Sequence, residues 1–491
     1  MTPLELEQLG DEIASLSDQL TRAYSRRIVH YVGVGADAAA LADARQSFRL
    51  APTVEQIRKN LYCILAKMAG DAFGRAEFAV AATLFEEALE VAPNRAEVHY
   101  NLSAAYMRLS LAKAMDNAFA AWAMEPTNAY YYRRGMMALG WLCNEDDAER
   151  FAAYRRAYLA DPGYVNAIAH ARAVLPDAVA AEAALTHAIS LKPDWPFARN
   201  FLGVVLANSG RIEEAARCFE RALPLHPGTR ERLWRLDRAF FQELAGWVPR
   251  HRQEPSWVAR SQPAKGDLVV ITACDSIYFD KYGGHFIEEL SRQSAVFLHI
   301  HIADADDAQI AAAVTALNGA LAGRFSLTVG RTATADIRPE VLATYYACLR
   351  FYVTERLLDV YGPLIFVTDI DIESLDGGLA EWAASFGDFD VATLVQPTQF
   401  PNEHYAIGRL LIHINDRTRR FLWMMMAFND YCFANGTASW WMDQSTFYCV
   451  ERFLNGDGLN LRVVTTTDRP EVFRPRYAST DNPLLDSVRG I

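Results

Sequence analysis

Two aspartates that follow a strongly apolar segment are the residues of this chain best suited to chemistry. In LIFVTDIDIESLDGG (364–378), four apolar residues and a threonine precede Asp369 and Asp371. Burying a charge without a partner is costly, so these carboxylates should emerge at the edge of a sheet and bind something. Carboxylate oxygens suit Mg²⁺ or Mn²⁺, and aspartates at positions i and i+2 beyond a strand are able to reach one ion. The alternative is a pair that only caps a turn.

Two other aspartate pairs have the same spacing but simpler interpretations. Asp304 and Asp306 precede a helix-forming segment, where helix capping explains both. Asp388 and Asp390 lie in SFGDFDV, a turn before a predicted strand, where a solvated loop is sufficient. Neither pair is therefore predicted to bind a ligand.

His299 and His301 alternate along a predicted strand, so both side chains face the same side of it. A hydrogen-bonded position in the core is favoured over a metal-binding pair.

The elements that must position the aspartates begin at Asp267, where strands start to alternate with helices. Strands are predicted at 268–276, 295–304, 324–330, 363–369, 390–396 and 408–415, the last of them edge-like. This order predicts an α/β domain with a mostly parallel sheet between helix layers. Ligands bind beyond the carboxyl ends of strands in such sheets, where Asp275, Asp304 and the Asp369 pair are expected.

The first half of the chain contains an internal repeat. An alanine five residues before a proline recurs with proline spacings of 33, 36, 31 and 34 residues. The five copies are Ala88/Pro93, Ala121/Pro126, Ala157/Pro162, Ala188/Pro193 and Ala222/Pro227. This register resembles the tetratricopeptide repeat, whose period is about 34 residues.

The last copy, FLGVVLANSGRIEEAARCFERALPLHP (201–227), matches the repeat most clearly. The resemblance implies helix pairs that stack into a superhelix with a concave face, which commonly holds a peptide or a partner protein. The alternative is a scaffold or oligomerisation platform with no ligand in the groove.

These patterns divide the chain into four predicted parts. Residues 1–61 form an N-terminal helical cap, and residues 62–243 form the tetratricopeptide superhelix. Residues 244–266 contain three prolines, mixed charge and no periodicity, which indicates a linker or an irregular bridging segment. Residues 267–491 form the α/β domain.

The α/β domain resembles a family of transferases in three segments. ITACDSIYFDKYGGHFIEEL, YYACLRFYVTERLLDVYGPLIFVTDIDI and WWMDQSTF are similar to the nucleotide-diphospho-sugar transferases of the GT-A fold, nearest to the glycogenin-like, family 8 type. The resemblance implies that Asp275 and Tyr278 lie near the donor base and that Arg350 contacts the donor. It also implies that Asp369 and Asp371 bind a divalent metal, with Asp369 contacting the donor.

A later motif of the same family is matched by Asp443 and Gln444, which the resemblance places near the donor sugar as catalytic residues. A helix N-cap is the alternative role for Asp443.

The family usually supplies a histidine as a third metal ligand near its C-terminus, and this chain departs from that pattern. No histidine follows His413. Asp481, Asn482 or water are the candidate substitutes, and Arg474 and Arg476 are candidates for neutralising the diphosphate directly.

A rival chemistry is that of the haloacid-dehalogenase-like phosphatases, which also carry two aspartates after an apolar strand. Those enzymes use a downstream lysine, and no lysine follows Asp371 here. Their aspartate pair also opens the domain, whereas three predicted strands precede this one.

Composition limits the remaining possibilities. The chain has 491 residues and a formal net charge of -12, which argues against nucleic acid as a partner. Seven scattered cysteines without a C-x-x-C pattern indicate reduced thiols in a cytoplasmic protein. No apolar run is long enough to span a membrane, and FLWMMMAF (421–428) is expected in a core helix.

The sequence therefore predicts a cytoplasmic, metal-dependent glycosyltransferase. It would move a sugar from a nucleotide diphosphate donor, expected to be a UDP-sugar, to an acceptor recruited by the repeats, with a protein as the expected acceptor or carrier. The alternative is a non-enzymatic adaptor that carries a degenerate transferase domain.

Overall fold

The computed structural model describes most of the chain and divides it into two compact units. The described residues are 3–125, 163–175, 177–225, 231–332, 337–375, 378–395, 400–402, 404–466 and 474–475, with isolated positions between 128 and 159. The units are Met1–Ala173 and Val174–Ile491. Their boundary falls inside the predicted superhelix of residues 62–243, so that region does not form one body.

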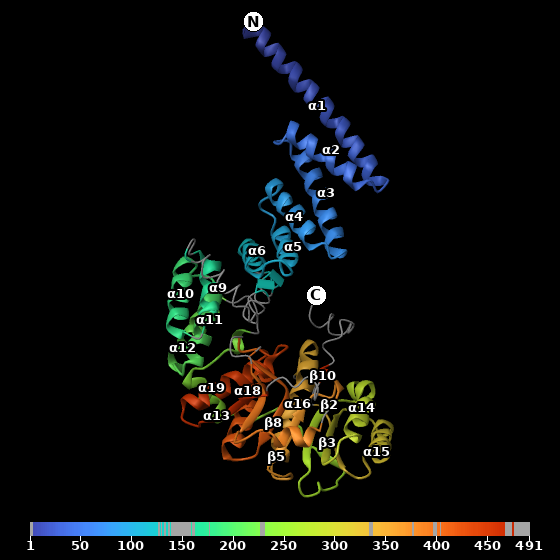
Figure 1. Cartoon of the computed structure of the whole chain (residues 1–491), viewed down its shortest axis with the longest axis vertical. Helices are drawn as coiled ribbons and strands as arrows, with labels where there is room; N and C mark the ends of the chain where they lie inside the picture. The colour runs from blue at the N-terminus through green and yellow to red at the C-terminus, as the bar shows by residue number, and fades with distance from the viewer. Residues whose placement is uncertain are drawn as a thin grey trace. The chain divides into compact units, whose positions relative to one another are not determined.

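The described part of the first unit is helical (Figure 1). Its helices are α1 (Pro3–Gly33), α2 (Asp37–Leu50), α3 (Glu55–Gly74), α4 (Phe78–Val91), α5 (Ala96–Tyr106), α6 (Leu111–Met124) and α9 (Tyr164–Ala173). Helices α1 and α2, α3 and α4, and α5 and α6 pack as successive pairs. Helix α3 begins before residue 62, so the predicted boundary between cap and repeats lies inside a helix.

The marker alanines of the repeat lie where helices pack closely. The described ones, Ala88, Ala121, Ala188 and Ala222, are fully buried. Ala157 and Pro162, of the third copy, lie outside the described residues. A Cβ atom on Gly203 would lie 2.6 Å from the ring of Phe219, so this crossing needs glycine. The prediction of helical repeats is confirmed for the described copies.

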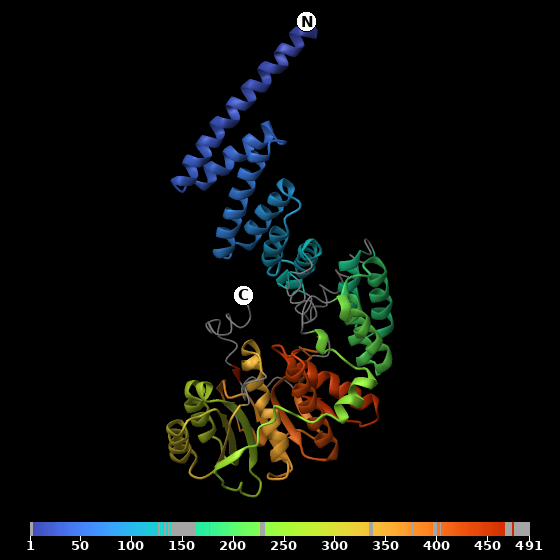
Figure 2. The same ribbon diagram turned by 180° about the vertical axis from the view of Figure 1, so that it is seen from behind.

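The second unit begins with the last repeat helices and continues into the sheet domain (Figure 2). Its first helices are α10 (Ala178–Leu191), α11 (Pro196–Asn208), α12 (Ile212–Ala222) and α13 (Arg238–Ala245), with short 3-10 turns at Leu223–Leu225 and Glu231–Leu233. The later helices are α14 (Ser276–Ser291), α15 (Asp307–Leu321), α16 (Leu342–Leu357), α17 (Leu379–Ala384), α18 (Asp416–Ala434) and α19 (Met442–Gly456), with a 3-10 turn at Pro339–Val341.

Within the described residues, the main sheet has eight strands in the order β1-β4-β3-β2-β5-β8-β7-β9. They are β1 (Ser256–Ala259), β2 (Leu268–Asp275), β3 (Val296–Ala303), β4 (Phe325–Gly330), β5 (Leu364–Thr368), β7 (Val391–Val395), β8 (Tyr405–His413) and β9 (Val463–Thr465). Strands β6 (Ile372–Ser374) and β10 (Arg474–Pro475) pair separately.

The sheet is mixed rather than mostly parallel. Strands β4, β3, β2 and β5 are parallel neighbours, whereas β8 pairs antiparallel with both β5 and β7. The prediction that β8 is edge-like was wrong, because β8 lies between β5 and β7 in the sheet. Its consecutive residues Leu410, Leu411 and Ile412 are buried, so both faces of the strand are covered.

Helices cover the sheet on both sides. Apolar residues of α14, α15 and α17 form one core with alternate residues of the strands, among them Val270, Leu298 and Phe366. Helix α16 packs against β2, β3 and β5. This arrangement buries the strands and leaves their carboxyl ends as the place where polar residues emerge.

The segment 244–266 was predicted as a linker, and the structure corrects that prediction. It contributes β1, which pairs antiparallel with β4 and forms one edge of the main sheet. Three groups in the residues before β1 donate hydrogen bonds to the buried carboxylate of Asp430 on α18. They are Trp247 Nε1 at 2.8 Å and the backbone N–H groups of Arg250 at 2.8 Å and His251 at 2.7 Å. The segment is therefore an integral part of the second unit.

The apolar run 421–428 lies in α18, where Met424, Met425 and Met426 are buried, so its prediction as a core helix is confirmed. Among the helices of the described residues, none has the length and apolarity that crossing a bilayer needs.

Candidate active site

The predicted strand ends meet at one edge of the sheet. Strand β2 pairs in parallel with both β3 and β5, so their carboxyl ends point the same way. Asp275 is the last residue of β2, Asp304 follows β3 and Asp369 follows β5. The expectation that these residues share one edge is confirmed.

Arg350 joins two carboxylates that are distant in sequence. It lies on α16, is only 4% exposed, and donates from Nη1 to Oδ1 of Asp369. Its Nη2 donates to Oδ2 of Asp443, at the start of α19, over 2.9 Å. The predicted site residues on α16, β5 and α19 thus converge through one guanidinium.

Gly408 on β8 has no side chain, and this leaves space for the carboxylate of Asp369. The Asp369 N–H donates to the Gly408 carbonyl over 3.0 Å, so the two backbones run side by side. A Cβ atom at residue 408 would lie 2.5 Å from Asp369 Oδ2, closer than van der Waals contact allows. Sequence reasoning missed Gly408, and its only signal was a glycine inside a predicted strand.

Asp443 is not a helix N-cap, so that alternative is wrong. Helix α19 starts at Met442, and its capping residue is Trp441, which has a φ of 65° and makes no side-chain cap. Asp443 is the second helical residue and is 8% exposed. Its Oδ1 accepts from the backbone N–H of Gln444 at 3.0 Å, while Oδ2 faces Arg350. Gln444 is half-buried beside it.

The site holds more negative than positive charge. Burial raises the pKa of Asp369 to about 6; the charge of Arg350 opposes this, and the charges of Asp371 and Asp443 add to it. Burial likewise raises the pKa of Asp443, against the lowering effect of Arg350. Three carboxylates around one guanidinium leave an excess of negative charge that a cation would relieve.

Asp275 and Tyr278 form the second half of the site. Asp275 caps α14 and accepts from the Tyr278 N–H over 2.6 Å, which sets the start of the helix. The Tyr278 hydroxyl then reaches across to Asp371 and donates to its Oδ2 over 2.8 Å. Tyr278 is 36% exposed, and its ring packs edge-on against Tyr282. The two residues therefore orient the second aspartate of the pair.

Asp304 is not a helix cap, contrary to the prediction. Only Asp306 caps α15, in a capping box with Gln309. Asp304 has a φ of 59°, and its carboxylate accepts from the Thr332 N–H over 2.7 Å and from the Tyr346 hydroxyl over 3.0 Å. It fixes the loop after β4 to the start of α16 at the same sheet edge as the aspartate pair.

The prediction of a solvated loop was also wrong for Asp390, which is fully buried. Its carboxylate accepts two hydrogen bonds from Arg417, at 2.9 and 2.7 Å, and one from the backbone N–H of Arg462 at 2.8 Å. Asp388 pairs with the Arg462 side chain at the surface. Asp390 therefore holds the start of α18 to the segment that leads into β9.

The two strand histidines are hydrogen-bonded core residues, as predicted. His299 contacts the Tyr361 hydroxyl at 2.6 Å and Thr328 Oγ1 at 3.0 Å. His301 contacts the same Thr328 oxygen at 3.0 Å and Gln253 Oε1 at 2.9 Å. Burial lowers the pKa of His299 to about 3 and that of His301 to about 4, so both are neutral near pH 7.

Asp369 and Asp371 fit a magnesium or manganese ion whose other ligands come from a phosphate substrate. Each carboxylate has a second oxygen beyond its bond to Arg350 or Tyr278. Within the part of the chain that the structure describes, no group of three His, Cys, Asp or Glu residues is placed to hold a metal. Two carboxylates with substrate phosphates and water are a common arrangement for these ions.

The C-terminal segment returns to this region through β10. Arg474 lies opposite Ser374 in the antiparallel pair of β10 with β6, which begins directly after Asp371. The other candidates for completing the site, Arg476, Asp481 and Asn482, lie outside the described residues.

Helix α19 carries Asp443 at one end and packs against the repeat helices further along. Asn208, the last residue of α11, accepts from the Tyr448 hydroxyl at 3.1 Å and from Arg452 Nε and Nη2 at 3.2 and 3.0 Å. The ring of Phe453 stacks on Phe241 of α13 at 3.9 Å. The last repeats therefore support the helix that positions Asp443.

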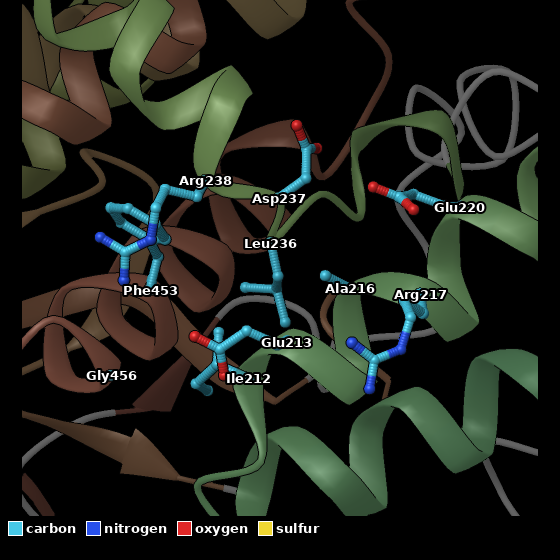
Figure 3. A pocket seen from close by; sticks show the side chains of 10 residues that line it. All are labelled: Ile212, Glu213, Ala216, Arg217, Glu220, Leu236, Asp237, Arg238, Phe453 and Gly456. Atoms are coloured by element: carbon cyan, nitrogen blue, oxygen red, sulfur yellow. The ribbon is translucent and has the colours of Figure 1, made fainter.

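A cavity of about 170 Å³ lies where α12 meets the end of α19 (Figure 3). Figure 3 shows Ile212, Glu213 and Arg217 of α12 on one side and Phe453 with Arg238 on the other. None of the predicted site residues lines this cavity, so it is a feature of the repeat–domain packing.

Comparisons with known proteins return helical-repeat structures at low similarity. A thermophilic TPR protein of Thermus thermophilus is 23% identical over 34% of this chain and 92% of its own, with a TM-score of 0.20. A tetratricopeptide repeat protein from Parabacteroides merdae is 13% identical over 44% of this chain and 84% of its own, with a TM-score of 0.22. MamA from Desulfovibrio magneticus is 16% identical over 42% of this chain and 94% of its own, with a TM-score of 0.18. No family model matches the chain, and no curated protein matches it. At such TM-scores these likenesses carry no weight, and the repeat assignment rests on the alanine register and the packed helix pairs.

Proposed function

We propose that the sheet domain is a divalent-metal-dependent glycosyltransferase that uses a nucleotide diphosphate sugar, with a UDP-sugar as the expected donor. The observation that carries this proposal is the convergence of Asp369 and Asp443 on Arg350 at the carboxyl edge of the sheet. These residues come from two segments, distant in sequence, that each resemble the same transferase family. If the resemblance were a coincidence, there would be no reason for the matched residues to contact each other.

Asp369 and Asp371 would hold Mn²⁺ or Mg²⁺ together with the donor phosphates. When bound, the ion neutralises charge on the departing diphosphate. Arg350 keeps the first carboxylate in place, and Tyr278 keeps the second in place. The exposed part of the Tyr278 ring offers the donor base a surface next to the aspartates.

Asp443 would act on the donor sugar. Glycosyl transfer develops positive charge at the anomeric carbon, which a nearby carboxylate stabilises. Because Oδ2 of Asp443 is bonded to Arg350, the group is held in one orientation rather than free to rotate. This favours a role in stabilising charge or orienting sugar hydroxyls over a role as a mobile base.

The repeats would recruit the acceptor, for which we propose a protein. Support comes from the packing of α11, α12 and α13 on the helix that carries Asp443, because a partner held by the repeats would be tethered to the transferase domain. The alternative function, an adaptor without catalysis, makes a different prediction for donor binding.

A panel of nucleotide sugars tests the proposal, read out as protection from thermal unfolding with and without Mn²⁺ and as donor hydrolysis. We expect at least one donor to raise the melting temperature in a Mn²⁺-dependent way. Asp369→Asn and Asp371→Asn should each abolish that shift.

Asp307→Asn, an exposed aspartate in the first turn of α15, is the matched control and should retain the shift. If no nucleotide sugar protects or is hydrolysed by the wild-type protein, the transferase proposal fails and the adaptor function stands.

A further inference from the structure

The N-terminal helix α1 has an exposed apolar face with a regular spacing. Leu9, Leu16 and Leu20 are 44%, 57% and 43% exposed. With Leu6, Ile13 and Ala23 they follow the alternating spacing of three and four residues that defines a coiled-coil seam. Large apolar side chains that line up on one helix face and remain in water mark an interaction surface.

Helix α2 does not cover this apolar face. Helix α2 packs against the C-terminal half of α1, where Ile28 is buried and Arg27 pairs with Asp43. Arg27 would occupy the next position of the seam, so the apolar face ends at Ala23. The exposed leucines lie before that point.

The charges of α1 are separated along its length. Residues 3–18 contain five acidic residues and no basic one, whereas residues 19–33 contain three arginines and no acidic one. In a parallel pair the acidic halves would lie side by side and repel each other. In an antiparallel pair in which the seam residues 6–23 meet, residues 3–10, with Glu5 and Glu7, lie opposite residues 19–26, with Arg22 and Arg26, and residues 11–18 of the two copies lie opposite each other.

We propose that α1 binds α1 of a second copy of this chain as an antiparallel helix pair. In this register the seam residue at position i lies opposite position 29 − i, which places Leu9 of one copy against Leu20 of the other. The flanking positions just before Leu6, Ile13, Leu20 and Arg27 are offset from the seam and pair as i with 31 − i, which places Glu5 opposite Arg26 and Glu12 opposite Gln19. The seam covers only residues 6–23, so the pairing is short and should depend on protein concentration.

Sedimentation velocity of the full-length protein over a range of concentrations tests the association. We expect a mass that approaches twice 54.9 kDa as concentration rises. Leu16→Glu and Leu20→Glu should each leave a monomer, because they place a charge in the seam.

Val29→Glu is the matched control, since Val29 is on the same helix and 73% exposed but lies off the seam. It should dimerise as the wild type does. A wild-type protein that stays monomeric at every concentration, or equal disruption by Val29→Glu, would overturn the proposal.

Crosslinking tests the orientation in a Cys63→Ser background, which removes an exposed native thiol. Chains with Glu12→Cys and chains with Gln19→Cys should crosslink when mixed, with the link mapped by mass spectrometry. Each variant alone should crosslink little. Equal crosslinking in the unmixed samples would rule out the antiparallel arrangement.

Discussion

Arg350 and Asp443, which are 93 residues apart in the chain, meet through a hydrogen bond of 2.9 Å between Nη2 and Oδ2. The same guanidinium also binds Asp369, so one side chain sets the position of both carboxylates. Removing it would change the electrostatics of the site and the packing of α16, β5 and α19 together.

Arg350→Met should lower the free energy of unfolding by about 3–5 kcal/mol, because it leaves buried Asp443 and partly buried Asp369 without their cationic partner. Urea denaturation measures the loss. Asp443→Asn removes one of those charges. The double variant should therefore lose less free energy of unfolding than the sum of the two single losses, by about 0.5–3 kcal/mol. Strictly additive losses would show that the residues do not act as a unit.

Asp443→Asn should lower turnover by about 10²–10⁴-fold, the range expected for a positioned catalytic carboxylate. Asparagine still accepts a hydrogen bond from Arg350, so donor affinity should change little. Steady-state kinetics with the donor found in the nucleotide-sugar panel measures both quantities. Activity within a few-fold of wild type would limit Asp443 to a structural role.

Gly408→Ala should weaken Mn²⁺-dependent donor binding by about tenfold or more, which corresponds to about 1.4 kcal/mol. The new methyl group would push on Asp369 Oδ2, which cannot retreat freely because Oδ1 is held by Arg350. Titration calorimetry with donor and metal measures the change. Gly284→Ala, at a helical position with open space around its Cβ, is the control and should bind normally.

A fragment that starts at Gly266 should fail to fold. It would lack β1, the three groups that donate to buried Asp430, and the repeat helices that support α19. A fragment that starts at Val174 keeps all of these and should unfold cooperatively. Circular dichroism melts of both fragments decide the matter, and a cooperative melt of the shorter one would show that these contacts are dispensable.

The two strand histidines should make the second unit less stable as pH is lowered from 7 to 5, against the opposing contribution of Asp369, whose raised pKa lets the folded state take up a proton in this range. His299 and His301 are neutral in the folded state, with pKa values of about 3 and about 4, whereas unfolded histidine titrates near 6.5. The unfolded state therefore binds protons that the folded state does not, and each histidine costs about 2 kcal/mol at pH 5.

Urea unfolding at several pH values measures the slope of the free energy of unfolding against pH. His301→Gln, which keeps hydrogen-bonding groups but does not titrate, should reduce the slope by about one proton between pH 6 and pH 5. An unchanged slope would show that His301 does not contribute to the pH dependence.

Local sequence signals were sufficient for six strands of the main sheet and for the place of the aspartate pair. The apolar run before Asp369 marks a buried strand, and the order of strands and helices predicts where its carboxyl end lies. The alanine register likewise predicted helix packing, because small residues are needed wherever two helices cross closely.

The partners of buried charges could not be predicted in the same way. Asp390 looked like a loop residue because Arg417 and the Arg462 backbone are 27 and 72 residues away in sequence. Periodicity shows that a residue is buried on α16, but it does not show that Arg350 faces two carboxylates there. Strand β1 was missed because the prolines and mixed charge of the surrounding segment, residues 244–266, match those of a linker, and only pairing with β4 makes it a strand.

The boundary between the two units, at residues 173 and 174, has a consequence for how such a chain could change by recombination. A genetic exchange that replaced everything before residue 266 would separate α19 from Asn208 and deprive Asp430 of its donors. An exchange upstream of residue 174 would replace the earlier helices and leave those contacts intact. The natural point for shuffling new helical arrays onto this domain is therefore inside the repeats, and residues 174–265 should be inherited together with the sheet domain.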